Sequence, residues 1–225
     1  MATNMTFDAP ADATLGDLRR RLAPAIADAA VFDGWSPEAV EQAAVANGVD
    51  PALAAFAFQD GPMAMIAAWI DHVDAAMAKS VAGAALSNMK IRERIRRLVW
   101  ARLEAVGGRE EALTRALSIM AMPQNIAAST RLGWRSADAM WRLAGDTATD
   151  YNHYTKRAIL GGIYAATLHV FARDTSEDKA ETRAFLDRRI DGIMRFEKAK
   201  AQFLRTPDER FSVTRLLGRL RYPAG

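Results

Sequence analysis

The chain of 225 residues has 30 lysines and arginines against 27 aspartates and glutamates, so its net charge of +3 gives no strong basic field. It has no cysteine, which excludes disulfides, a thiol nucleophile and cysteine-ligated metals, and which fits a reducing compartment such as the cytoplasm. Alanine and methionine supply much of the hydrophobic half of the composition, whereas valine, isoleucine and the aromatic residues are modest. We therefore expect an all-α protein.

The first sixty residues predict three short helices with the outline of a helix-turn-helix. One helix runs from Leu15 to the turn at Gly34, a second begins at Pro37, and a third spans Pro51 to Phe58. A DNA-reading helix requires hydrogen-bonding and cationic side chains, and residues 51–58 contain no arginine, lysine, asparagine, serine or threonine. We expect residues 15–60 to be a helix-turn-helix portion without DNA-reading residues.

Residues 61–205 predict a larger helical portion with broad apolar faces. Methionines line one face of the helix after Pro62, two tryptophans lie seven residues apart before Leu143, and Gly161-Gly162 lie in the middle of a helix from Asp150 to Phe171. Each pattern also suits an ordinary core or close helix packing, which are the commoner outcomes, so the residues permit a lipid cavity without showing one. The candidate cavity residues are Met63, Ile66, Trp69, Ile70, Met77, Trp134, Trp141, Leu160, Gly161, Gly162, Tyr164 and Phe185.

Two arginine-rich helices are candidates for contact with anionic partners. The arginines of residues 89–103 are interpreted as a solvated face, with anionic lipid headgroups as the second interpretation and nucleic acid as the third. Residues 207–221 predict a C-terminal amphipathic helix, which either lies in a membrane interface or docks on the protein itself. No segment reaches the ~20 apolar residues of a membrane span. The candidate membrane residues are Phe211, Arg215, Leu216, Leu217, Arg219 and Leu220.

Motifs for catalysis are missing from the sequence. It has no Gly-x-Ser-x-Gly elbow, phosphate-binding loop or dinucleotide-binding glycine pattern. Asp150 and His153 share a helical face, but a metal requires further ligands, and His72 and His169 lack a ligand-like context. We expect no enzyme, no catalytic residue, no metal and no cofactor other than a bound lipid or isoprenoid quinone intermediate.

Three stretches resemble the ubiquinone-biosynthesis accessory family often called the ninth Coq protein, a lipid-binding branch of the TetR-like fold. They are Phe-Asp-Gly-Trp-Ser at residues 32–36, the stretch at residues 144–157 that ends in Tyr-Thr-Lys-Arg, and Phe-Leu-Asp-Arg-Arg-Ile-Asp at residues 185–191. The resemblance extends over nearly the whole chain from about Leu15. It implies a TetR-like bundle of about nine or ten helices, a cavity for an isoprenoid quinone precursor or another lipid, a last helix that engages the membrane, and a homodimer.

The resemblance also implies a partner. In the family, the lipid is presented to the di-iron demethoxyubiquinone hydroxylase through a patch on the signature helix, and the matching positions here are Asp150, His153, Tyr154 and Arg157. The chain departs from the family at His153, where a tryptophan is usual. No targeting segment precedes the match, so we expect a bacterial member in the cytoplasm, peripheral on the inner face of the cytoplasmic membrane. The alternative is a TetR-like transcriptional regulator with a lipophilic effector.

Overall fold

The computed structural model describes residues 14–82, 86–147 and 151–204, and in these ranges it is all-α, as predicted. Three short 3₁₀ turns, at Leu86–Asn88, Pro123–Asn125 and Glu177–Lys179, join some of the helices. The helices are α1 (Leu15–Asp33), α2 (Pro37–Ala46), α3 (Pro51–Ala57), α4 (Pro62–Val81), α5 (Ile91–Val106), α6 (Glu110–Met120), α7 (Ile126–Leu143), α8 (Tyr151–Phe171) and α9 (Ala180–Leu204).

The described residues fall into two compact units that divide within α9, between Leu186 and Asp187. The first unit holds α1 to α8 and the beginning of α9, and the second holds the remainder of that helix to Leu204. The predicted amphipathic helix at residues 207–221 lies outside the described residues. Every feature of the candidate site below belongs to the first unit.

The first three helices begin where local capping chemistry predicts. The Thr14 hydroxyl accepts a hydrogen bond from the Asp17 amide at 3.2 Å, and the Asp17 carboxylate reaches back to the Thr14 amide at 3.1 Å. Ser36 and Asp50 cap α2 and α3 with their side-chain oxygens, which accept hydrogen bonds from the amides of Ala39 and Ala52. These caps satisfy amides that have no partner inside a helix, so the starts of α1 to α3 follow from the sequence alone.

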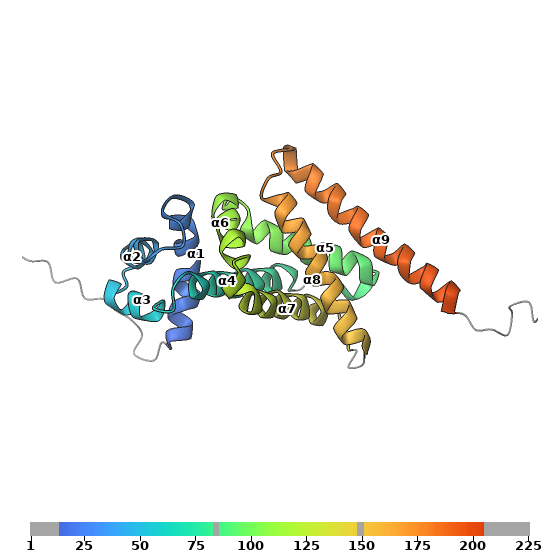
Figure 1. Cartoon of the computed structure of the whole chain (residues 1–225), viewed down its shortest axis with the longest axis horizontal. Helices are drawn as coiled ribbons and strands as arrows, with labels where there is room; N and C mark the ends of the chain where they lie inside the picture. Colours follow the sequence, from blue (N-terminus) through green and yellow to red (C-terminus); the bar gives the residue numbers. More distant parts are fainter. Residues whose placement is uncertain (1–13, 83–85, 148–150, 205–225) are drawn as a thin grey trace, which may run out of the picture. The chain divides into compact units, whose positions relative to one another are not determined.

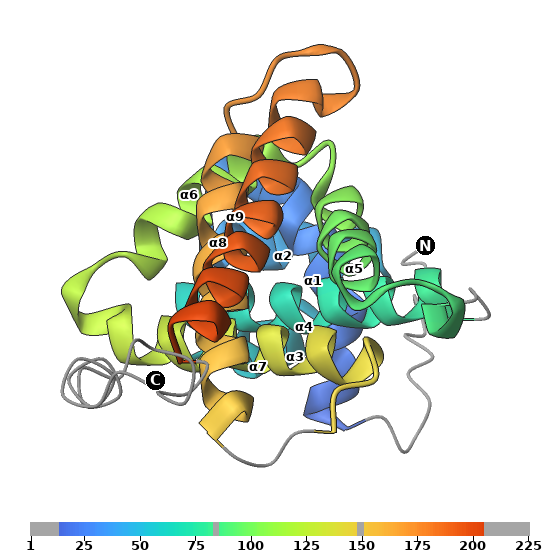
Figure 2. The same ribbon diagram turned by 90° about the vertical axis from the view of Figure 1, so that its right-hand side faces the viewer.

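Helix α4 leads from α1–α3 into the group formed by α5 to α8 (Figure 1). Figure 2 separates α5 and α6, which lie on either side of α4 and α8. The indole of Trp35 joins the two groups, because its Nε1 donates to the Ala112 carbonyl oxygen at 3.0 Å and its ring lies 5.3 Å from that of Trp69. The core therefore continues across residue 60.

Two helix starts differ from the positions that the sequence predicts, which are Gln124 and Asp178. Helix α7 begins at Ile126, after the 3₁₀ turn that Pro123 opens. Helix α9 begins at Ala180, because Asp178 and Lys179 have positive φ values of 51° and 57°. The carboxylate of Asp174 sets this second geometry, since Oδ2 accepts from the Thr182 amide at 2.8 Å and from its hydroxyl at 2.6 Å.

A helix that crosses a bilayer must be both long and apolar, and this condition can be applied to the described residues. None of their helices combines the length and apolar character that crossing a bilayer requires. The consecutive helices α3 and α4 meet the criterion only when taken together, and they are bent by 91° at the break between them.

Candidate functional site

A cavity of about 550 Å³ lies between five helices, α4 to α8. Its volume falls within the range of small-molecule sites, and its walls are mainly aliphatic and aromatic. The lining residues are Ile66, Trp69, Ile70 and Val73 of α4; Arg102 and Val106 of α5; Leu113, Ala116, Leu117 and Met120 of α6; Ser129, Thr130, Gly133, Trp134 and Ser136 of α7; and Arg157, Ala158, Gly161, Gly162, Tyr164, Ala165 and Leu168 of α8.

Small residues of α8 form one wall of this cavity. A Cβ atom built on Gly161 or Gly162 meets no atom of the described residues within 4 Å outside the local helix backbone. Close helix packing, the commoner use of such a strip, therefore does not occur at these two glycines. Each glycine costs about 1 kcal/mol relative to alanine inside a helix, so the helix is less stable at the two positions that line the cavity.

Seven of the twelve predicted cavity residues line the cavity. The other five lie elsewhere: Met77 and Leu160 are buried among the helices, Met63 and Phe185 are half-buried away from the lining, and Trp141 donates its Nε1 hydrogen to the Lys156 carbonyl oxygen at 3.0 Å. Those that line the cavity are Ile66, Trp69, Ile70, Trp134, Gly161, Gly162 and Tyr164. Their role in lipid binding stays a prediction.

Sequence reasoning missed the contribution of α6. Leu113, Ala116, Leu117 and Met120 all line the cavity, and their spacing of i, i+3, i+4 and i+7 marks a single helical face. That periodicity was sufficient to predict a buried face, but an apolar stripe does not reveal whether it faces a packed core or a cavity.

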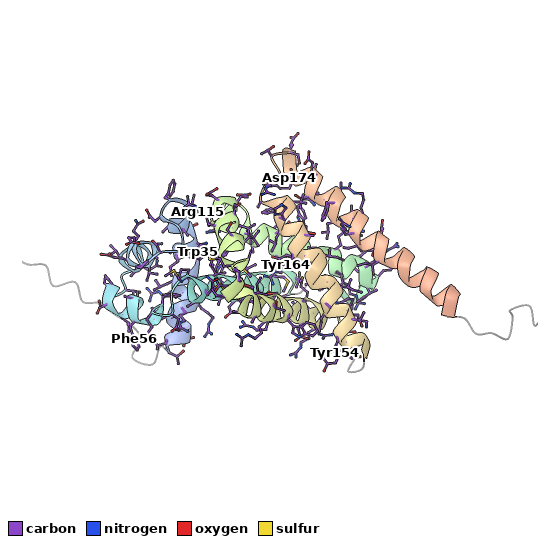
Figure 3. The ribbon with its side chains drawn as sticks, viewed as in Figure 1. Trp35, Phe56, Arg115, Tyr154, Tyr164 and Asp174 are labelled. Carbon is purple, nitrogen blue, oxygen red and sulfur yellow. The ribbon has the colours of Figure 1, made fainter. Side chains whose placement is uncertain are left out.

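The cavity wall also contains a buried polar cluster, which we call the Arg102 cluster and which comprises Arg102, Asp74, Ser136 and Tyr164. Arg102 is only 2% exposed and forms an ion pair through Nη1 with Asp74 Oδ1. The other carboxylate oxygen accepts from the Ser136 hydroxyl at 2.9 Å. The Arg102 guanidinium lies 4.6 Å from the centre of the Tyr164 ring, and Figure 3 shows Tyr164 on α8 within the helix group.

Burial dominates the electrostatics of this cluster. It raises the pKa of Asp74 above the ordinary value, although the Arg102 guanidinium and the Ser136 hydroxyl act in the opposite direction. Burial likewise raises the pKa of Tyr164. The Arg102 Nε atom is buried and has no hydrogen-bond partner among the described residues. Arg102 was predicted to belong to a solvated arginine face, and its burial contradicts that prediction.

Arg157 does not face a partner, which corrects the expectation carried over from the family. Its side chain is 2% exposed, and its Nε donates to Asp138 Oδ1 at 2.6 Å while Nη1 donates to Asp146 Oδ2 at 3.1 Å. These contacts join α8 to α7 and to the loop between them. Buried guanidinium groups are usually paired with carboxylates in this way. A match to a sequence pattern does not reveal whether such a side chain is buried.

Two of the other predicted partner residues lie near the surface at the beginning of α8. Tyr154 is 61% exposed, and its ring lies 5.1 Å from the His153 ring in an edge-to-face arrangement. Figure 3 shows Tyr154 close to the start of α8. The Tyr154 ring also lies 6.0 Å from that of Trp134, which lines the cavity. Asp150, the fourth residue of the predicted patch, lies outside the described residues.

Helix α3 presents an apolar outer face. Leu53 and Phe56 are 41% and 54% exposed, and the neighbouring exposed positions Ala52 and Ala55 carry only methyl groups. Figure 3 places Phe56 on this helix, among the N-terminal helices. The side chains available on this face cannot form hydrogen bonds with base edges or ion pairs with phosphates.

A family model described as COQ9 matches residues 126–197, which comprise α7, α8 and most of α9. The predicted resemblance is confirmed: the chain carries a COQ9 segment. A ubiquinone biosynthesis protein COQ9 from Rattus norvegicus is 36% identical over 167 residues, which cover 72% of this chain and 54% of the relative. The COQ9 of Homo sapiens is 32% identical over 184 residues, 79% of this chain and 58% of that protein. The chain thus spans little more than half the length of these COQ9 relatives.

The fold of this COQ9-like chain resembles that of a TetR transcriptional regulator from Nitrosomonas europaea. The two structures match with a TM-score of 0.62 at 21% sequence identity, over 78% of this chain and 97% of the regulator. The predicted TetR-like fold is therefore confirmed. The predicted location in the cytoplasm, on the inner face of the cytoplasmic membrane, is contradicted, because the COQ9 relatives from Rattus norvegicus, Bos taurus and Homo sapiens are all named as mitochondrial proteins.

Proposed function

We propose that this chain is a non-enzymatic accessory protein of ubiquinone biosynthesis. It binds an isoprenoid quinone precursor or another lipid in the cavity between α4 and α8 and presents it to a membrane-associated hydroxylase. The observation that carries the proposal is the cavity itself, because its volume of about 550 Å³ is lined mainly by aliphatic and aromatic side chains. The similarity to proteins named for ubiquinone biosynthesis supports the choice of this pathway.

The composition of the walls favours a lipid chain over a polar metabolite. Burial of apolar surface contributes about 25 cal/mol per Å², so a hydrocarbon chain gains affinity along the whole apolar wall. The polar groups of a hydrophilic metabolite would lose their hydrogen bonds to water against the same wall, which would weaken its binding. Gly161 and Gly162 support this proposal, since the room beside them suits a chain that lies along α8.

Trp134 supports presentation to a partner. Trp134 lines the cavity, and the centre of the exposed Tyr154 ring lies 6.0 Å from that of its indole. A partner bound to Tyr154 and His153 would therefore be separated from the lipid by one side chain. The residues at 207–221 are proposed to bring the chain to the membrane surface, and the fold is proposed to act as a homodimer.

The test of lipid binding compares two leucine substitutions. Gly161→Leu places a side chain at the cavity wall where the added Cβ atom meets no neighbour within 4 Å, and leucine suits a helix better than glycine. Ala75→Leu adds a leucine at an exposed position of α4 that does not line the cavity. Mass spectrometry of lipid extracted from the purified proteins should find an isoprenoid lipid in the parent and in Ala75→Leu, and strongly reduced lipid in Gly161→Leu. Equal lipid in all three, or no lipid in the parent, would contradict the proposal.

A second comparison tests the membrane contact. Removal of the residues after Thr206 should abolish binding to liposomes that contain anionic lipids while the helical circular dichroism spectrum is retained. Binding that persists would place the membrane contact elsewhere on the chain. Light scattering of the full chain and of the shortened chain would show whether each is a dimer.

The alternative function, a transcriptional regulator, requires DNA binding. The likeness to a TetR regulator concerns the fold, and the apolar face of α3 provides no side chains for readout of bases. We expect no salt-dependent shift of duplex DNA by the purified chain. A shift that weakens as the salt concentration rises would favour the regulator.

A further inference from the structure

The turn between α6 and α7 exposes apolar side chains and carries no charge. Residues 116–130 contain no lysine, arginine, aspartate or glutamate, although 25% of the chain's residues are of these four types. Met122 is 43% exposed and Ile126 is 51% exposed, and the exposed alanines beside them add further apolar surface. We call residues 119–127 the α6–α7 tip. A contiguous apolar surface without charges indicates an interaction site.

The α6–α7 tip also satisfies its own polar groups. Asn125 Nδ2 donates to the Ile119 carbonyl oxygen at 2.8 Å, and the Ser129 hydroxyl donates to the Met120 carbonyl oxygen at 2.8 Å. These two carbonyl oxygens belong to the last turn of α6, where a helix offers no partners for them. The Thr130 hydroxyl donates within its own helix, also at 2.8 Å. Polar groups that are paired in this way can leave water at a low cost.

An arginine borders the α6–α7 tip on each side. Arg115 lies in α6 and Arg131 lies in α7, each within two turns of the tip. Arg115 is half-buried and pairs with Glu111, whereas Arg131 is exposed and forms no ion pair with another described residue. Long cationic side chains beside an apolar surface can reach the phosphates of anionic lipids while the apolar residues enter the bilayer.

Helix α3 provides a contrast to the α6–α7 tip. Phe56 is as exposed as Ile126, but Asp50 and Asp60 lie at the two ends of the helix, and residues 22–78 contain no lysine or arginine. The phosphate groups of anionic lipids would be repelled by this acidic surface. Of these two apolar surfaces, the α6–α7 tip is therefore the one that suits an anionic membrane.

The α6–α7 tip adjoins an opening of the cavity. Met120 of α6 and Thr130 of α7 both line the cavity, and Thr130 is also exposed. The cavity therefore reaches the protein surface at the beginning of α7. A long hydrocarbon chain is poorly soluble in water, so its transfer between a bilayer and a protein cavity is favoured when the opening of the cavity touches the bilayer.

We propose that the α6–α7 tip inserts into the surface of an anionic bilayer and places this opening of the cavity against the membrane. Met122 and Ile126 enter the boundary between headgroups and acyl chains, about 5–10 Å deep, and Arg115 and Arg131 bind headgroup phosphates. The contact is distinct from the one proposed for residues 207–221. Passage of a lipid through the opening rests on the proposed lipid-binding function.

The experiment uses the absence of cysteine from the chain, because one introduced cysteine then carries a fluorophore to a single position. Ile126→Cys tests the α6–α7 tip, and Phe56→Cys is the matched control of similar exposure. Each full-length chain carries a polarity-sensitive label and is mixed with vesicles of phosphatidylcholine and phosphatidylglycerol. The emission of the label at position 126 should shift to shorter wavelength and be quenched by brominated acyl chains. The label at position 56 should show neither change.

Three results would overturn the proposal. The first is a chain that sediments with the vesicles while its label at position 126 stays in water. The second is equal quenching of the labels at positions 126 and 56, which would mean that the chain adsorbs without a preferred face. The third is a shift at position 126 that depends on protein concentration and not on vesicles, which would identify a second copy of the chain as the occupant of the tip.

Arg131→Gln tests the role of charge in the labelled Ile126→Cys chain. Loss of one cation next to an anionic surface should raise the lipid concentration at half-maximal emission shift by about fivefold. Arg97→Gln removes an exposed arginine of α5, which lies on the other side of α4 and α8 from α6, and should leave that concentration nearly unchanged. Equal effects of the two substitutions would overturn the role of Arg131.

This inference and the proposed function can fail separately. If lipid is extracted from the purified chain but the label at position 126 does not enter the bilayer, only the inference fails. If the label enters the bilayer but the purified chain contains no lipid, the proposed function fails and the membrane contact stands.

Discussion

Replacement of Gly161 by alanine tests whether the room beside α8 is real. Glycine inside a helix costs about 0.8–1.0 kcal/mol relative to alanine, and the added Cβ would meet no atom within 4 Å outside the local helix backbone. Gly161→Ala should therefore increase the free energy of unfolding by about 1 kcal/mol. For a chain of this size, that corresponds to a rise in Tm of about 2–4 °C.

The assay is thermal unfolding followed by circular dichroism, on protein freed of lipid with detergent. Gly162→Ala serves as a second test, since its Cβ also has open space around it, and the double variant should show roughly the sum of the two shifts. A fall in Tm for either variant would refute the reasoning. It would mean that another surface, such as a second copy of the chain, packs closely on the glycines.

Three further contacts are tested by substitution. Arg157→Met should cost about 3–5 kcal/mol in urea unfolding because it leaves Asp138 and Asp146 without their buried partner, whereas Arg142→Ala, which removes a mostly exposed partner of Asp138, should cost less than about 1 kcal/mol. Equal losses of stability in the two variants would indicate that Arg157, like Arg142, is a surface residue. Hydrogen bonds from Ser176 and Thr182 outweigh the opposite effect of burial and hold the pKa of Asp174 well below its ordinary value of 3.8. The stability that they contribute is present above that value and is lost as the pH falls below it, so the parent chain should lose more stability than Asp174→Asn between about pH 4 and pH 2; parallel acid-unfolding curves would argue against this. Trp35→Phe removes the donor to the buried Ala112 carbonyl oxygen and should cost about 1–3 kcal/mol, and a loss near zero would show that this contact does not anchor α6.

The helix boundaries divide into those that local chemistry determines and those that it does not. Thr14, Ser36 and Asp50 each cap a helix through an amide two or three residues further on, so the short sequence around each of them is sufficient. The start of α9 depends on Asp174, whose carboxylate binds Thr182 eight residues away. A contact of that length forms only when the connection between α8 and α9 is already folded, and the local sequence does not predict it.

Some residues of the candidate site could likewise be predicted from single helices, and others only from the tertiary structure. Periodicity and residue size predicted the aromatic side chains Trp69 and Trp134 and the glycine pair, because those features belong to single helices. The ion pair of Arg102 with Asp74 joins two residues that lie 28 positions apart in the sequence, on helices α5 and α4. An arginine on an amphipathic helix is usually solvated, so only the tertiary structure distinguishes Arg102 from the exposed arginines of α5.

Helices α7 and α8 combine the elements on which the proposed function depends. They lie in the segment that the COQ9 family model matches, and they contribute Trp134 and the glycine pair to the cavity. Arg157 fixes α8 to Asp138 of α7 one turn beyond Tyr154, and the residues that line the cavity continue along α8 from there to Leu168. Because a buried ion pair holds the end of the helix that carries Tyr154, the partner surface is expected to stay rigid. The glycine pair, which has no close neighbours, is then the part of α8 with the room and the backbone freedom to adapt to the lipid.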